Sequence, residues 1–246
     1  MSAGIVVRKC VTIEEYQTCV RLQRDIWGED DLEVEPSTLF VVAAHTGGQV
    51  LGAFDGERLV GYTLAVAGVR NGVPYLHSHM TGVLQKYRDR GVGRLLKLFQ
   101  REEALGRDIR LIEWTFDPLE TRNAHFNLNR LGAICRRYLP NLYGITTSPL
   151  HRGLATDRLV AEWLLDSPRV ITAVAQGSVE PVIEAGKVTL PHDLERRKAE
   201  EPECLADIQS YLRRQFDDAF ARSYAAVGLR SSAQGTEYVL APWSDF

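Results

Sequence analysis

The feature that most constrains the fold is a strand that runs into a helix through a loop with two glycines. The apolar run "GVPYLHSHMTGVL" predicts a strand, and the loop "QKYRDRGVG" follows it directly. Four apolar residues then recur at helical spacing: Val92, Leu95, Leu96 and Phe99. A helix that begins this way leaves amide hydrogens of its first turn without acceptors, at the positive end of its dipole. The segment is therefore either an ordinary turn or a cradle for phosphate oxygens.

Strand and helix patterns alternate on both sides of this loop, from Ile5 to about Asp166. The run "GIVVRKC" predicts a strand, a helix begins after Thr12, and a short helix follows Pro36. Two apolar runs separated by "DGER" predict a β-hairpin, and "IRLIEWTFD" predicts a buried strand. The segment "LETRNAHFNLNRLGA" predicts a helix that ends at Gly132. The runs "AICRRYLPNLYG" and "DRLVAEWLL" predict the last two strands of this series.

The residues after Asp166 have a different texture, with turn residues and charges up to about Glu203. An apolar stripe at helical spacing follows: Leu205, Ile208, Leu212, Phe216 and Phe220. This helix needs burial, either on the core, over one end of a cleft, or against a second subunit in a homodimer. The run "TEYVLAP" predicts one more strand.

Composition excludes several classes of function. The 29 basic and 32 acidic residues give a net charge of −3, and no basic block forms the face that nucleic-acid binding requires. No apolar run approaches the roughly 20 residues needed to span a bilayer, and no signal peptide begins the chain. We expect a cytoplasmic protein without membrane association. Four scattered cysteines, Cys10, Cys19, Cys135 and Cys204, are expected to be free thiols.

Two common phosphate motifs do not fit the loop, because it lacks a third glycine and no Gly-Lys-Ser/Thr follows. The pattern that remains is Arg88-x-x-Gly91-x-Gly93, within "GVLQKYRDRGVGRLL". This segment resembles the pyrophosphate-binding segment of the GNAT acyl-CoA N-acyltransferases. The order of elements also resembles that family, as does a helix with Ala124 eight positions before its closing Gly132.

The resemblance implies an α/β (α+β) fold with a mixed, largely antiparallel central sheet flanked by helices. It covers a domain of residues 1–166, and residues 167–246 form a C-terminal extension outside the family's core. It implies acetyl-CoA or another acyl-CoA as co-substrate and no metal. By position, the cofactor-binding residues are Thr81, Val83, Arg88, Arg90, Gly91, Val92, Gly93, Arg94 and Asn123. The amide of Val83 would polarise the thioester carbonyl, which makes it the main-chain catalytic group.

The proton donor and the general base are left open by the sequence. Leu128 stands where many family members carry the tyrosine that protonates the thiolate, and Tyr138 and Tyr143 are the nearest substitutes. Tyr143 is taken as the catalytic candidate. An amine must be neutral to attack, so a base is expected. Glu113, in an apolar strand, is the candidate, with Asp117 at the end of that strand as an alternative.

Other polar residues have two interpretations each. His77 and His79 lie on the same face of a strand. They do not form a zinc site, because a third ligand is missing. They either line the acceptor pocket or are surface histidines. Asn123 is a candidate for contact with pantetheine, while Asn127 and Asn129 are expected to cap the helix or to be exposed.

The function predicted from this resemblance is acetyl transfer from acetyl-CoA to a primary amine of a small molecule, by direct attack in a ternary complex. One alternative is succinyl transfer from succinyl-CoA to a free amino acid, because the histidines and arginines can accommodate carboxylates. A different class is a CoA-binding or regulatory module without turnover, which Leu128 favours.

Overall fold

The computed structural model describes residues 4–28, 34–146, 153–181, 184–232 and 235–242. Packing divides the chain into two compact units, each with its own core. The first unit runs to Glu113 and the second begins at Trp114. The boundary after Asp166 that the sequence predicts concerns the family's core and stays a prediction.

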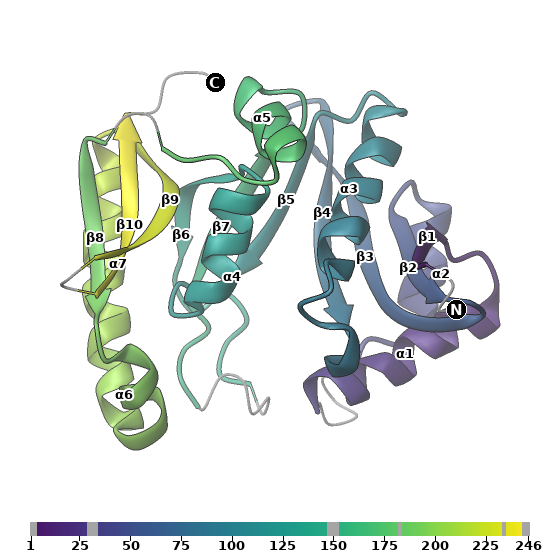
Figure 1. Cartoon of the computed structure of the whole chain (residues 1–246), viewed down its shortest axis with the longest axis horizontal. Helices are drawn as coiled ribbons and strands as arrows, with labels where there is room; N and C mark the ends of the chain where they lie inside the picture. The colour runs from purple at the N-terminus through teal and green to yellow at the C-terminus, as the bar shows by residue number, and fades with distance from the viewer. Residues whose placement is uncertain (1–3, 29–33, 147–152, 182–183, 233–234, 243–246) are drawn as a thin grey trace. The chain divides into compact units, whose positions relative to one another are not determined.

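The first unit contains a sheet in which neighbouring strands follow chain order (Figure 1). Its strands are β1 (Val6–Lys9), β2 (Gln49–Asp55), β3 (Arg58–Arg70), β4 (Val73–Val83) and the start of β5 (Leu111–Phe116). Strands β1 to β4 pair antiparallel, and β4 pairs in parallel with β5 at Leu76 and His77. The hairpin predicted at "DGER" is confirmed. Gly56, with φ of 60°, makes its turn.

Helices cover both faces of this sheet. Helices α1 (Ile13–Trp27) and α2 (Ser37–His45) pack on one face, where Tyr16 and Phe40 meet Tyr62 of β3. Helix α3 (Val92–Leu105) packs on the other face through Val92 and Leu96. Thr12 and Glu15 form the predicted capping box of α1. The helix predicted after the glycine loop is confirmed, and it ends beside Gly106 as expected.

The second unit has a sheet in the order β7-β6-β9-β10-β8, with antiparallel neighbours. Its strands are β6 (Ile134–Leu139), β7 (Arg158–Leu164), β8 (Gly186–Pro191), β9 (Tyr224–Ser232) and β10 (Gly235–Pro242). Its helices are α4 (Thr121–His125), which continues as a π-helical turn (Phe126–Arg130), and α5 (Pro168–Gln176), α6 (Leu194–Glu200) and α7 (Leu205–Ala221). Short 3-10 turns lie at Gln85–Tyr87 and Pro202–Cys204.

The predicted apolar stripe is the buried face of α7. Phe216 is fully buried, with its ring stacked on Tyr138 of β6 and edge-on to Tyr238 of β10. Arg213 on the same helix donates to both carboxylate oxygens of the fully buried Asp157 at 2.9 Å. The stripe is therefore buried within the second unit, which is the core-packing alternative. The prediction of "TEYVLAP" as a strand is confirmed by β10.

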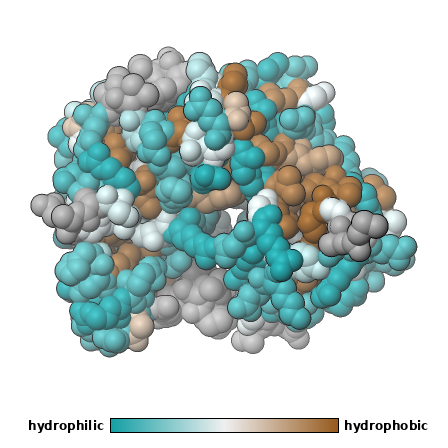
Figure 2. Space-filling model, viewed as in Figure 1, coloured by the Kyte–Doolittle hydropathy of each residue, from teal (hydrophilic) through white to brown (hydrophobic). Residues whose placement is uncertain are grey.

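Four elements of the second unit were not predicted: α5, β8, α6 and β9. Helix α5 is capped by Ser167, whose hydroxyl accepts the amide of Val170. The four cysteines are free thiols, as predicted, and three of them are buried. Figure 2 shows hydrophilic residues over most of the visible face, with hydrophobic residues gathered in a patch on the first unit. Among the described residues, no helix combines the length and the apolar character needed to cross a membrane.

Candidate active site

The loop between β4 and α3 has the geometry that the phosphate interpretation requires. Gly91 is the N-cap of α3 in the left-handed conformation, with φ of 78°. It supplies no side-chain cap, and the first helical bond is from the amide of Leu95 to the carbonyl of Gly91 at 3.0 Å. The amides of Val92 and Gly93 therefore have no acceptor within the helix. This helix end can accept an anion through its main chain.

The space that an added side chain would find at Gly91 and at Gly93 shows why each position carries a glycine. A side chain on Gly91 would meet no atom within 4 Å, so the positive φ and not crowding explains the glycine there. Gly93 has no positive φ, and its nearest neighbour for an added Cβ is Cγ2 of Val83 at 4.0 Å. Nothing in the protein itself therefore requires a glycine at position 93. A glycine here lets a ligand approach the main chain closely.

The loop arginines differ in what they contact. Arg88 donates to the carbonyls of Val83 at 3.1 Å and Ile26 at 3.2 Å, so it fastens the loop to the end of β4. Arg90 lies over the ring of Tyr87 at 5.7 Å. Arg88 thus has a structural role, and its predicted contact with the cofactor stays a prediction, whereas Arg90 is an exposed cation of the loop.

The end of β4 brings the two predicted main-chain donors beside β3. Thr81 pairs with Thr63 and Val83 pairs with Gly61. The Thr81 hydroxyl lies 2.7 Å from the Thr63 hydroxyl, which in turn donates to the carbonyl of Met80 at 2.8 Å. The side chain of Thr81 is therefore held against the sheet, and a ligand role for this residue would fall to its backbone.

A β-bulge interrupts β4 just before these residues. Leu64 of β3 pairs with Met80 and Ala65 pairs with Ser78, so His79 is the extra residue. Nε2 of His79 lies 2.8 Å from Oε1 of Glu35, and both side chains are about one-third exposed. The hydrogen bond with His79 lowers the pKa of Glu35.

Structure comparison places this arrangement among known folds. A GNAT-family protein from Desulfovibrio desulfuricans superposes on 66% of this chain and 99% of its own length, with a TM-score of 0.54 and 14% identity. NAA60 of Arabidopsis thaliana is solved with a bisubstrate analogue and also with acetyl-CoA. The complex with the analogue gives a TM-score of 0.53 and 17% identity, and the match covers 65% of this chain and 98% of NAA60. The Escherichia coli ribosomal-protein-S18-alanine N-acetyltransferase gives 0.53, 11% identity and coverage of 67% and 96%.

The chain has the GNAT fold. The fold class predicted from the sequence is therefore confirmed, and the resemblance is confirmed at the level of the fold. No protein-family model and no curated protein matches the sequence. At 11 to 17% identity the likeness concerns the fold, so each residue's role rests on the geometry of this chain.

Glu113, the predicted base, is held by an ion pair in the first unit of this GNAT fold. Its side chain is almost fully buried, and both of its carboxylate oxygens accept from the guanidinium of Arg70. The hydrogen bond to Glu113 raises the pKa of Arg70. Sequence position alone shows the apolar strand around Glu113, but not the arginine on β3 that neutralises it. Its role as the base stays a prediction.

The sequence analysis did not single out the buried Lys97 on α3. Its ammonium donates to Ser78 of β4 at 2.9 Å and to the side-chain oxygen of Gln100 at 3.0 Å. Burial lowers the pKa of Lys97 to about 7. The signal that could have revealed it is its place in the helix, next to Leu96 on the apolar face.

In the second unit, the helix predicted to end at Gly132 does end there, as α4 and its π-helical turn. The burial of its polar residues differs from the prediction. Ala124 and Leu128 are fully buried, and an added Cβ at Gly132 would lie 3.0 Å from Cβ of Ala173. Leu128 is a core residue here. The expectation that Asn127 and Asn129 cap the helix or are exposed was wrong, because both are buried. The side-chain oxygen of Asn129 accepts the amide of Leu229 at 2.8 Å, and Asn123 is exposed.

The two candidate tyrosines are in different environments. Tyr138 is buried and donates to Asp157 at 2.8 Å, and burial with this hydrogen bond raises the pKa of its hydroxyl. Tyr143 is half-exposed, and its hydroxyl lies 2.9 Å from that of Thr115 on β5. Burial also raises the pKa of Asp117, the alternative base. Of the two hydroxyls, that of Tyr143 is the more accessible.

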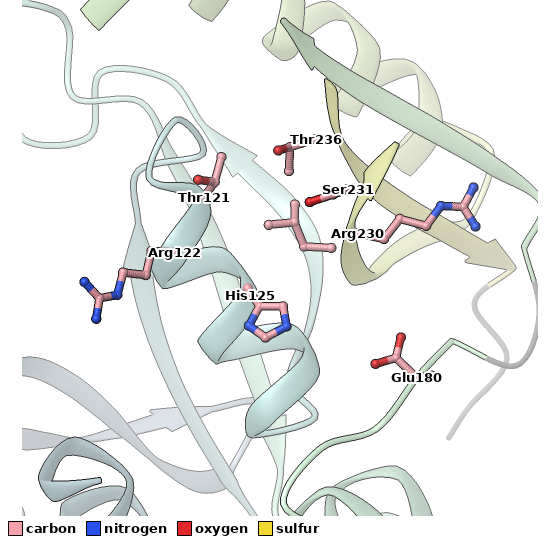
Figure 3. Close-up of a pocket in the computed structure, with 8 residues that line it drawn as sticks. Thr121, Arg122, His125, Glu180, Arg230, Ser231 and Thr236 are labelled. Carbon is pink, nitrogen blue, oxygen red and sulfur yellow. The ribbon is translucent and has the colours of Figure 1, made fainter. Parts of the chain in front are cut away.

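A cavity of about 460 Å³ in the second unit is separate from these candidates (Figure 3). Eight residues line it, and none is a predicted site residue: Thr121, Arg122, His125, Glu180, Leu229, Arg230, Ser231 and Thr236. Figure 3 shows the guanidinium groups of Arg122 and Arg230 directed away from each other. Arg230 pairs with Glu184 at 2.7 Å. Within the described ranges, no three metal-ligating side chains gather into a group.

Proposed function

We propose that this chain is an acyl-CoA-dependent N-acyltransferase that transfers an acetyl group from acetyl-CoA to the primary amine of a small molecule. The observation that carries the proposal is the left-handed Gly91 at the start of α3, directly after β4 of a GNAT fold. This position presents the amides of Val92 and Gly93 to an anion. The complex of NAA60 with acetyl-CoA supports this donor for the fold.

The donor would be held mainly by the backbone of the loop. A diphosphate carries several oxygens that accept hydrogen bonds, and amides at the positive end of a helix dipole supply donors without side-chain entropy. The open space at Gly93 lets such a group approach the main chain. Arg90, exposed beside the loop, adds positive charge near it.

The proposed reaction is direct attack of a neutral amine on the thioester carbonyl. The new carbon–nitrogen bond forms as the carbonyl becomes a tetrahedral oxyanion, and the carbon–sulfur bond then breaks to release CoA thiolate. The amide of Val83 is the proposed donor to the oxyanion, and such a donor contributes about 3 kcal/mol to the transition state. Because this role belongs to the main chain, substitution of the valine side chain would leave it in place.

Two other interpretations are separated by turnover. Release of CoA thiol is measured with acetyl-CoA and succinyl-CoA, each against panels of small amines, free amino acids and short peptides. Acetyl-dependent release with a small amine is the expected result. Faster release with succinyl-CoA and an amino acid would favour the succinyl alternative, and release only with peptides would replace the small-molecule acceptor. Binding of acyl-CoA without release across the panels would favour a module without turnover.

A further inference from the structure

In the pair of His79 and Glu35, the carboxylate of Glu35 orients the imidazole of His79 as it would orient a general base. An ionised carboxylate only accepts hydrogen bonds, so the hydrogen between Nε2 of His79 and Oε1 of Glu35 belongs to the imidazole. In the neutral ring this fixes the tautomer and leaves the lone pair on Nδ1. A neutral imidazole with a free Nδ1 lone pair accepts a proton near neutral pH.

Glu35 is held in place independently of His79. The fully buried side chain of Gln23 on α1 donates to the carbonyl of Glu35 at 2.9 Å, and accepts its amide at 2.7 Å. Two bonds from one buried amide fix the backbone on both sides of this residue. The carboxylate therefore meets the imidazole from a fixed position, which orients the ring.

The bulge explains why His79 can serve a site on β4. An extra residue in one strand re-aims its side chain relative to a regular strand. His79 lies two residues before Thr81 and four before Val83, so it is on the strand that carries the proposed oxyanion donor. Two residues of extended strand span about 7 Å.

Two other candidate bases of the first unit, Glu113 and Lys97, are engaged elsewhere. Glu113 shares both carboxylate oxygens with Arg70, and Lys97 is enclosed between α3 and β4. Among the described residues, the titratable groups recorded against His79 are Glu35 and His77, whose ring centroid is 6.4 Å away.

We infer that His79 is the general base of the proposed acyl transfer, and that Glu35 positions it; this inference rests on the proposed function. The acceptor's ammonium gives one proton to Nδ1 of His79, which passes it to water. The neutral amine then attacks the thioester. The second proton of the nitrogen leaves with the departing thiolate, so the products are the amide, CoA thiol and one proton.

The test uses the full chain with acetyl-CoA and the best amine of the panel, across pH 5.5 to 9. His79→Gln keeps a side-chain donor for Glu35 but removes the base. We expect kcat to fall by about 100-fold or more, with an unchanged KM for acetyl-CoA. Glu35→Gln should lower kcat by less than His79→Gln does, with an unchanged KM for acetyl-CoA, because the ring loses the carboxylate that orients it. His45→Gln, which changes an exposed histidine at the end of α2, is the matched control and should keep kcat.

Failure of the inference and failure of the proposed function look different. A His79→Gln variant with the same thermal midpoint and kcat within twofold would overturn the inference, while the transferase would stand. Loss of kcat in His77→Gln, with no loss in His79→Gln, would move the base to the neighbouring histidine. Absence of turnover by the unsubstituted protein overturns both.

Discussion

Gly93→Ala separates the ligand interpretation of the loop from the demands of the fold. The protein leaves room for the added methyl group, whose nearest neighbour would be Cγ2 of Val83 at 4.0 Å. Position 93 lies in the first turn of α3, where alanine is a better helix former than glycine by up to about 1 kcal/mol. Stability should therefore be unchanged or higher, with a thermal midpoint raised by up to about 4 °C.

Binding of acyl-CoA should fall in the same variant. A phosphate oxygen that accepts from an amide approaches to about 2.9 Å, and a methyl group beside that amide displaces it. A hydrogen bond to a charged group contributes about 1.5 to 3 kcal/mol. Because each 1.4 kcal/mol is a factor of ten, its loss corresponds to about 10- to 100-fold in Kd.

Calorimetric titration with acetyl-CoA and a thermal melt measure the two effects on one sample. Gly106→Ala is the matched control, since it makes the same change at the other end of α3. An added Cβ there meets Glu102 O at an ordinary 3.5 Å. A Gly93→Ala protein that binds acetyl-CoA as tightly as the Gly106→Ala control would refute the reasoning.

Three further predictions concern the buried charges and the candidate acid. The pKa of Lys97 is about 7 in the folded state and near 10.5 in the unfolded state, so the unfolded state binds more protons between these pH values. The free energy of unfolding should therefore rise with pH there by about 1.4 kcal/mol per unit. Lys97→Met should lose that slope in urea titrations at pH 7, 8 and 9. Arg213→Met leaves the buried Asp157 without its guanidinium, so the free energy of unfolding should fall by about 1 to 3 kcal/mol, a range lowered because Arg213 is 40% exposed. Urea unfolding measures this, with Arg214→Met as the control. Equal stability of the two variants would contradict the prediction. The assignment of Tyr143 as proton donor predicts that Tyr143→Phe lowers kcat by about 100-fold with unchanged affinity for acetyl-CoA, and an unchanged kcat would end that assignment.

Elements with strong local signals were predictable from the sequence. The "DGER" turn, the glycine loop before α3 and the apolar stripe of α7 each depend on residues within a few positions of one another. Strand β8 was missed because it is short and contains Gly186 and Lys187, and β9 was missed because its small residues Ala225, Ala226 and Gly228 weaken the strand pattern. Their stability comes from pairing with β10, which is a nonlocal interaction.

The candidate site shows the same division between local and nonlocal information. The glycine loop before α3 was predicted from the motif, but the left-handed conformation of Gly91 was not. The partner of Glu113 is 43 residues away on β3, and the partner of His79 is 44 residues away before α2. Such pairs decide which carboxylate is neutralised and which imidazole is oriented, and they exist only after the chain has folded.

The most direct test of the account is calorimetric titration of the unsubstituted protein with acetyl-CoA at neutral pH and moderate ionic strength. The account predicts binding at one site per chain with Kd between about 1 μM and 1 mM, the range typical of enzyme substrates. Free CoA should compete for that site, because the diphosphate is common to both. Absence of binding by acetyl-CoA, succinyl-CoA and free CoA would contradict the account.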